Sequence, residues 1–222
     1  MPLCCCCCCC CEEGTEEETT PLPVSAKPPK QAKVLEKYDL LVVKKVDVAE
    51  YDERFSDIAE LYNQQVKNRQ TMTDCLSKLR DISGSSTLTG CFQALRTKYS
   101  SYDPQIKMTG YKFSLAVKES DDLPEELQEA QELTKNLSLA TKLLIGSQTK
   151  LDGMVFSVAQ EKSEMESKIK QTHLGYLDQI RLIENLEDNI RNINSAKQFS
   201  KDYDKEATGV LEEIATITGA AV

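Results

Sequence analysis

The sequence predicts an all-α protein, an antiparallel helical bundle or coiled coil that follows a disordered N-terminal tail rich in cysteine and proline. Two observations carry this prediction. Apolar residues recur at intervals of three and four over most of residues 47–217, which is the period of a helix with one buried face. The chain has only nine glycines and seven prolines, and no proline follows Pro124, so residues that end helices are scarce. We therefore expect a tail at residues 1–38 and a helical body at residues 39–218.

The tail contains an uninterrupted block of eight cysteines, residues 4–11. Clustered thiols near a terminus accept palmitate, and two or more acyl chains hold a protein stably on a bilayer. Contiguous cysteines lack the spacing of a structural zinc site, and soft-metal capture and an inert low-complexity run remain as alternatives. The predicted lipidation sites are Cys4, Cys5, Cys6, Cys7, Cys8, Cys9, Cys10 and Cys11.

An acidic stretch and a proline-rich tether separate this block from the body. Residues 12–18 contain five glutamates, which an anionic leaflet repels, whereas the lysines from Lys27 to Lys45 offer a compensating attraction. Residues 19–33 contain four prolines and are expected to stay extended. Because the start of the chain lacks the basic n-region and the cleavage site of a secretory signal, we expect the protein at the cytoplasmic face of a membrane.

The first amphipathic helix is predicted at residues 47–82. Asp47 and Glu50 have the spacing of a capping box, and Gly84 suits the left-handed residue that follows a helix. A second, shorter helix is predicted at residues 86–102, because it must end before the next proline.

Two segments fit either a helix or a strand. Residues 111–118 alternate between polar and apolar side chains, as a strand does, yet their apolar residues also share one helix face. We predict a helix at residues 105–118, because a lone strand would lack a partner. The apolar run at residues 39–43 fits either a strand or the approach to the first helix.

The rest of the chain carries the longest apolar stripe, with a heptad-like spacing. Gly146, Gly153 and Gly175 each cost about 1 kcal/mol inside a helix, and we expect the chain to fold back between the first two. This predicts helices at residues 122–146 and 150–217. The first and third stripes would then cover one another in a bundle, although a second copy of the chain would bury the same faces in an elongated coiled coil.

Composition disfavours the catalytic and nucleic-acid-binding classes. The chain has one histidine, His173, and no tryptophan, and it contains no phosphate-binding, zinc-protease or calcium-loop motif. A net charge of −9 leaves no sustained basic field for nucleic acid. We therefore expect neither an enzyme nor a nucleic-acid-binding protein, and no metal or cofactor site.

One stretch suggests contact with a partner helix. Gln179 lies within an apolar stripe, an arrangement that resembles the glutamine-centred layer of Q-type SNARE helices. Members of that family also use clustered acylated cysteines, so the resemblance implies membrane fusion through a four-helix complex. The predicted contact residues are Ile169, Tyr176, Gln179, Ile183, Leu186, Ile190 and Ile193.

These observations favour a peripheral membrane-associated helical adaptor. Its anchor would be the acylated cysteines, and it would act through contacts with other helical proteins or with a second copy of itself. The alternatives are a soluble coiled-coil interaction protein with an inert cysteine block and a SNARE-like membrane-fusion helix protein.

Overall fold

The computed structural model describes residues 35–118, 120, 122–172 and 174–220, all within one compact unit, Lys33–Val222. These residues are mainly helical, which confirms the predicted all-α class. The cysteine block and the expected disorder of the tail lie outside the described residues. The elements in chain order are α1 (Ala49–Ser83), α2 (Leu88–Lys98), a 3-10 turn η1 (Ser100–Tyr102), β1 (Gln105–Thr109), β2 (Lys112–Ala116), α3 (Glu125–Lys170) and α4 (Tyr176–Thr218).

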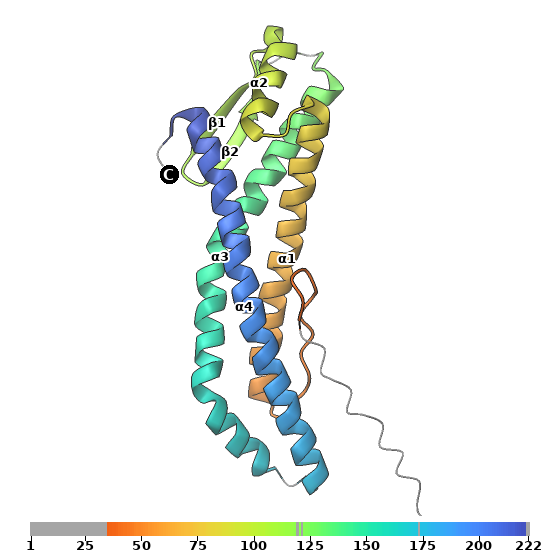
Figure 1. Ribbon diagram of the computed structural model, residues 1–222, viewed down its shortest axis with the longest axis vertical. Coiled ribbons are helices and arrows are strands. Elements are labelled where there is room, and N and C mark those ends of the chain that lie inside the picture. Colours follow the sequence, from red (N-terminus) through yellow and green to blue (C-terminus); the bar gives the residue numbers. More distant parts are fainter. Residues whose placement is uncertain (1–34, 119, 121, 173, 221–222) are drawn as a thin grey trace, which may run out of the picture. The chain divides into compact units, whose positions relative to one another are not determined.

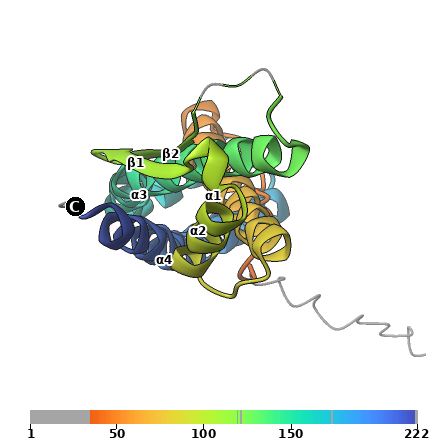
Figure 2. The same ribbon diagram turned by 90° about the horizontal axis from the view of Figure 1, so that it is seen from above.

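Three long helices, α1, α3 and α4, lie side by side (Figure 1). The α1 and α3 helices are antiparallel: Gln65 donates a hydrogen bond to Ser147 at 3.0 Å, while Arg54, earlier in α1, pairs with Glu161, later in α3. The connection from α3 to α4 is a tight fold-back, so α4 runs parallel to α1. The shorter elements gather at one end of the bundle, where α2 contacts both α1 and α4 (Figure 2).

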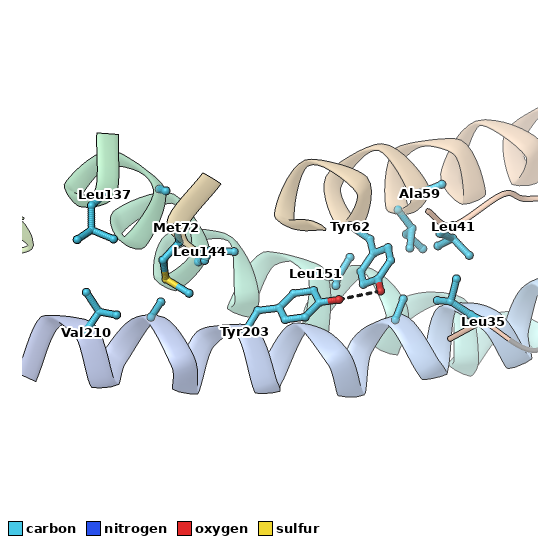
Figure 3. Close-up of a cluster of buried hydrophobic side chains, with 14 of the residues drawn as sticks. Leu35, Leu41, Ala59, Tyr62, Met72, Leu137, Leu144, Leu151, Tyr203 and Val210 are labelled. Carbon is cyan, nitrogen blue, oxygen red and sulfur yellow. Dashed lines mark hydrogen bonds between the residues drawn. The ribbon is translucent and has the colours of Figure 1, made fainter. Parts of the chain in front are cut away.

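The core is the continuous apolar interior of this bundle (Figure 3). The α3 helix contributes the longest series of buried side chains, because its inward positions face both α1 and α4. Two tyrosines lie at the centre: Tyr62 of α1 and Tyr203 of α4 are both fully buried, with ring centroids 6.3 Å apart and hydroxyl oxygens 3.4 Å apart. The fully buried leucines of α3 are Leu127, Leu137, Leu144 and Leu151.

The expected fold-back between Gly146 and Gly153 is wrong, because α3 continues through both glycines for 46 residues. The helix is held there by its flanking residues, since Leu144 and Leu151 are buried against the other helices. Burying a leucine contributes roughly 1.5–3 kcal/mol, more than the roughly 1 kcal/mol that each glycine costs. The chain reverses after Lys170 instead, and Gly175, another expected bend, is the residue before α4.

The helix expected at residues 105–118 is also wrong, because these residues form the antiparallel hairpin of β1 and β2. A strand at residues 111–118 has no partner that is evident from the sequence, and in the structure β1 is that partner. A two-residue loop joins them, and its first residue, Gly110, has φ +56°, a conformation that glycine adopts without strain. The inward residues of β2, Phe113 and Leu115, are buried against α3.

The predicted bounds of the first two helices are close to those of α1 and α2, but the cap of the first helix differs. The capping box of Asp47 and Glu50 does not form: Val48 is the N-cap, and Asp47 has a positive φ of 56°. The carboxylate of Asp52 instead accepts a hydrogen bond from the Val46 backbone N–H at 2.7 Å. At the other end of α1, Gly84 adopts the predicted left-handed conformation with φ +67°.

Replacing Leu137 with alanine tests the core. Leu137 is fully buried whereas Leu139, two residues later on the same helix, is 57% exposed. We expect Leu137→Ala to lower the free energy of unfolding by about 2–5 kcal/mol, because it leaves a cavity, and Leu139→Ala to change it by less than about 0.5 kcal/mol. Urea unfolding followed by circular dichroism measures both. Equal losses would contradict the assignment of these two faces of α3.

The buried tyrosines predict a loss of stability at alkaline pH. Burial raises the pKa of both the Tyr62 and the Tyr203 phenols, so the folded state retains two protons that the unfolded state releases near pH 10. Stability is therefore intact below that pH and falls above it, by at most about 1.4 kcal/mol per pH unit for each phenol. Unfolding of the Tyr62→Phe/Tyr203→Phe variant in urea between pH 8 and 11 should show a shallower fall than the wild type, and identical slopes would refute this explanation.

Candidate interaction site

The first described residues form an extended segment, residues 35–46, which we call the strap. It runs beside α1 and α4 and belongs to neither a helix nor a strand (Figure 1), so neither expectation for residues 39–43 is confirmed. As far as Lys44, its side chains alternate between buried or partly buried positions and exposed ones. Leu35, Leu41 and Val46 are buried in the same core as the bundle residues. The strap, which follows the predicted tether in the sequence, is therefore packed into the folded body.

Asparagine side chains hold the strap by its backbone. The Asn63 carboxamide accepts a hydrogen bond from the Leu41 N–H at 2.7 Å and donates one to the Leu41 carbonyl at 3.0 Å. Asn189 of α4 forms the same pair with Lys44, at 2.8 and 2.7 Å. Each asparagine thus satisfies one donor and one acceptor of an extended backbone, as a neighbouring strand would.

Two further asparagines of α4 extend this contact along the strap. Asn185 donates to the Lys45 carbonyl at 2.8 Å, and Asn192 accepts from the Leu35 N–H at 3.3 Å. These asparagines are not among the predicted site residues, although the sequence contains a signal for them. Asparagine is a poor helix former, and three asparagines at intervals of four and three lie on one face of a predicted helix.

A charged cluster fixes the beginning of the strap. Glu206 of α4 accepts hydrogen bonds from Arg69 at 2.7 Å and from Lys37 at 3.3 Å. The Arg69 guanidinium also lies over the Tyr38 ring, 4.2 Å from its centroid. Tyr38 has a φ of 103°, which is strained for a bulky residue, and the cation–π contact offsets part of that strain.

Two of the lysines expected to attract a membrane are therefore paired within the body. Lys37 contacts Glu206, and the Lys44 ammonium lies 2.6 Å from the Asp188 carboxylate. Their charges are neutralised locally, so the compensating attraction predicted for the segment up to Lys45 is reduced.

The predicted partner-helix stripe lies mostly inside the bundle. Ile169, Leu186 and Ile193 are fully buried, and Ile183 and Ile190 are partly buried against the same core. The chain's own helices cover these side chains, because an intramolecular and an intermolecular helix contact require the same apolar spacing. Tyr176, at 75% exposed, is the one apolar member of the predicted set that projects into solvent.

Gln179 has a local role that differs from a glutamine layer. Its side-chain amide donates to the carbonyl oxygens of Thr172 at 3.0 Å and Lys170 at 3.2 Å. These carbonyls belong to the end of α3 and the turn after it, where helix carbonyls lack partners within the helix. Gln179 therefore closes the turn between α3 and α4.

Exposed apolar residues gather at this turn. Leu174, Tyr176, Leu177 and Ile180 are 41%, 75%, 79% and 37% exposed, and we call them the apolar tip. Contiguous exposed apolar residues are typical of contact surfaces.

Within the described part of the chain, no group of three or more His, Cys, Asp or Glu residues is arranged to hold a metal ion, and no helix is long and apolar enough to span a bilayer. Cys75 and Cys91 are buried free thiols; burial raises the pKa of the Cys75 thiol, which lowers its reactivity.

No protein-family model, curated protein or solved structure matches this chain.

Removing one asparagine pair should release the strap. Asn189→Ala leaves the Lys44 N–H and carbonyl without their partner, a cost of about 1–3 kcal/mol, and we expect faster amide hydrogen exchange in peptides that cover residues 41–46. The exposed Asn194, which bonds only within α4, provides the control, and Asn194→Ala should leave this exchange unchanged. Unaltered exchange in Asn189→Ala would show that the asparagine does not hold the strap.

Proposed function

We propose that this chain is a peripheral membrane-associated helical adaptor, anchored by S-acylation of Cys4–Cys11 and acting through protein contacts. The anchor rests on the chemistry of eight clustered thiols, since several acyl chains partition far more strongly than one. The adaptor role rests on the body, a helical bundle that leaves an apolar surface exposed.

The strap is the observation that carries this proposal. A lipid anchor is useful to an adaptor only if the chain between the anchor and the body resists being pulled away. The side-chain amides of Asn63 and Asn189 form hydrogen bonds with the backbone of the strap. The ion pairs of Lys37 and Lys44 add to this attachment. The strap thus supports a role in which a membrane-bound tail positions the folded body.

The apolar tip is the partner surface in this proposal. Tyr176 and Leu177 are the most exposed of its residues, and aromatic residues are enriched where proteins meet. Because most of the predicted stripe is occupied by the chain's own core, the contact would use the tip rather than the length of α4.

The experiment compares wild type with a variant in which Cys4–Cys11 are all serine, expressed in cells, fractionated and assayed by acyl exchange. We expect acyl-dependent mass shifts and stable membrane association for the wild type. The serine variant and wild type treated with neutral hydroxylamine should lose the mass shifts and most of the membrane association, because several acyl chains partition far more strongly than the body alone. A Cys75→Ala/Cys91→Ala variant is the control and should behave as wild type, because both thiols are buried.

The two alternative outcomes are distinct. Wild type that is soluble and unmodified would overturn the anchor and favour a soluble interaction protein with an inert cysteine block. Wild type that remains membrane-bound without acylation would assign attachment to the body instead.

A further inference from the structure

Four lysines surround a groove between the β1–β2 hairpin and α3. The groove measures about 580 Å³, and its lining includes Lys107, Lys112, Lys135 and Lys142, which we call the lysine face. Two of them come from the hairpin and two from α3, so residues distant in sequence form one basic surface.

The hairpin register explains how its two lysines share a side. Lys107 pairs with Ser114, and Thr109 pairs with Lys112. Alternate residues of a strand point to the same face, and these four are exposed while Phe113 and Leu115 point inward. Lys107 and Lys112 are therefore diagonal neighbours on the outer face of the hairpin.

The lysines of α3 lie on the side of that helix nearest the hairpin. Lys135 and Lys142 are seven residues apart, which places them on one face, and Leu139 lies between them with 57% exposure. The Phe113 N–H donates to Ser138 at 2.9 Å, which fixes the hairpin against this part of α3.

Apolar side chains are exposed beside the basic ones. Besides Leu139, Leu143 is 43% exposed and Tyr111, in the hairpin loop, is 55% exposed. Along α3, β2 passes from Leu115 beside Gln131 to Phe113 beside Ser138, so the loop that carries Tyr111 lies toward the Lys142 end of the face.

Little negative charge neutralises the lysine face. Among the residues that the structure describes, Lys107, Lys112 and Lys142 have no carboxylate within 4.0 Å, and only Lys135 is paired, with Glu132 at 3.2 Å on the same helix. Both members of that pair are exposed, and such surface pairs contribute little.

We infer that the lysine face binds the anionic surface of a bilayer, with Tyr111 and Leu139 entering the headgroup region. The combination of lysines around exposed aromatic and aliphatic side chains is that of interfacial membrane binding. An acidic protein segment would match the charge but would leave the exposed apolar residues unexplained. This inference rests on the proposed membrane association and supplies the basic second signal that the glutamates of residues 12–18 do not.

The chain is long enough for the anchor and this face to meet one membrane. The strap begins at Leu35, bound to Asn192, whereas the hairpin contacts the end of α4 through Met108 and Thr218. Those two positions of α4 are about 39 Å apart at 1.5 Å per residue. Residues 12–34 can span up to about 75 Å when extended.

The test uses the full chain with Cys4–Cys11 replaced by serine, so that no acyl chain contributes. Its sedimentation is measured with vesicles of phosphatidylcholine alone and with vesicles that also contain phosphatidylserine, the anionic lipid that gives the cytoplasmic leaflet its negative surface potential. We expect binding only to the anionic vesicles. Lys107→Glu/Lys142→Glu should weaken it by about tenfold or more, whereas Lys67→Glu/Lys78→Glu, an equal charge change on exposed lysines of α1, should weaken it by about twofold or less.

A fluorescence measurement separates membrane insertion from charge alone. The chain contains no tryptophan, so Tyr111→Trp introduces a single reporter at the exposed hairpin loop. Its emission should shift to shorter wavelength with anionic vesicles and stay unchanged with neutral ones.

Three results would overturn the inference: no binding to anionic vesicles, equal weakening by both lysine pairs, or lysine-dependent binding to polyglutamate without vesicle binding. The last would assign the face to an acidic protein segment. If the protein does not bind anionic vesicles but is acylated in cells, only the inference about the lysine face is overturned. If the protein is not acylated in cells, the proposed anchor is overturned, and vesicle binding remains evidence for the lysine face.

Discussion

The fold depends on covering the apolar stripe of α3 from two sides. At 1.5 Å per residue, its 46 residues extend for about 69 Å, and a helix with this much apolar surface is not stable alone in water. The α1 and α4 helices cover most of that length, and the β1–β2 hairpin contacts α3 near its beginning, at Gln131 and Ser138. The antiparallel order, the reversal after Lys170 and the position of the hairpin all follow from this need.

The strap is held mainly by hydrogen bonds to its backbone, in contrast to the apolar packing of α3. An extended backbone in a helical groove has no neighbouring strand to receive its hydrogen bonds, and unpaired buried groups are costly. Asn63 and Asn189 supply those bonds in the geometry of a strand pair, from side chains on opposite helices. The groove therefore accepts the strap largely through its backbone, while Leu41 and Val46 set its register by burial.

The helical part of the fold was predictable because the apolar residues recur with the period of a helix. The hairpin was not, since β1 has only five residues and its pairing with β2 depends on cover from α3. The bend near Gly146 was misplaced because glycine propensity is local, whereas burial of Leu144 and Leu151 depends on tertiary contacts. The predicted contact residues from Ile169 to Ile193 are mostly apolar, but periodicity does not say which chain covers them. The lysine face was hidden because its members are up to 35 residues apart in sequence.

The strap also has a consequence for the order in which the chain assembles. Its contacts with α4 join residues separated by 140 to 169 positions, whereas α1 and the hairpin contact mostly elements that are nearer in the sequence. A ribosome adding about 5–20 residues per second needs between roughly 7 and 30 s to make the residues between Lys44 and Asn189. During that interval the strap has been synthesised but its groove does not yet exist. Seating of the strap is therefore a late event, and in the proposed function the enzyme that acylates Cys4–Cys11 would meet these thiols before the body has formed.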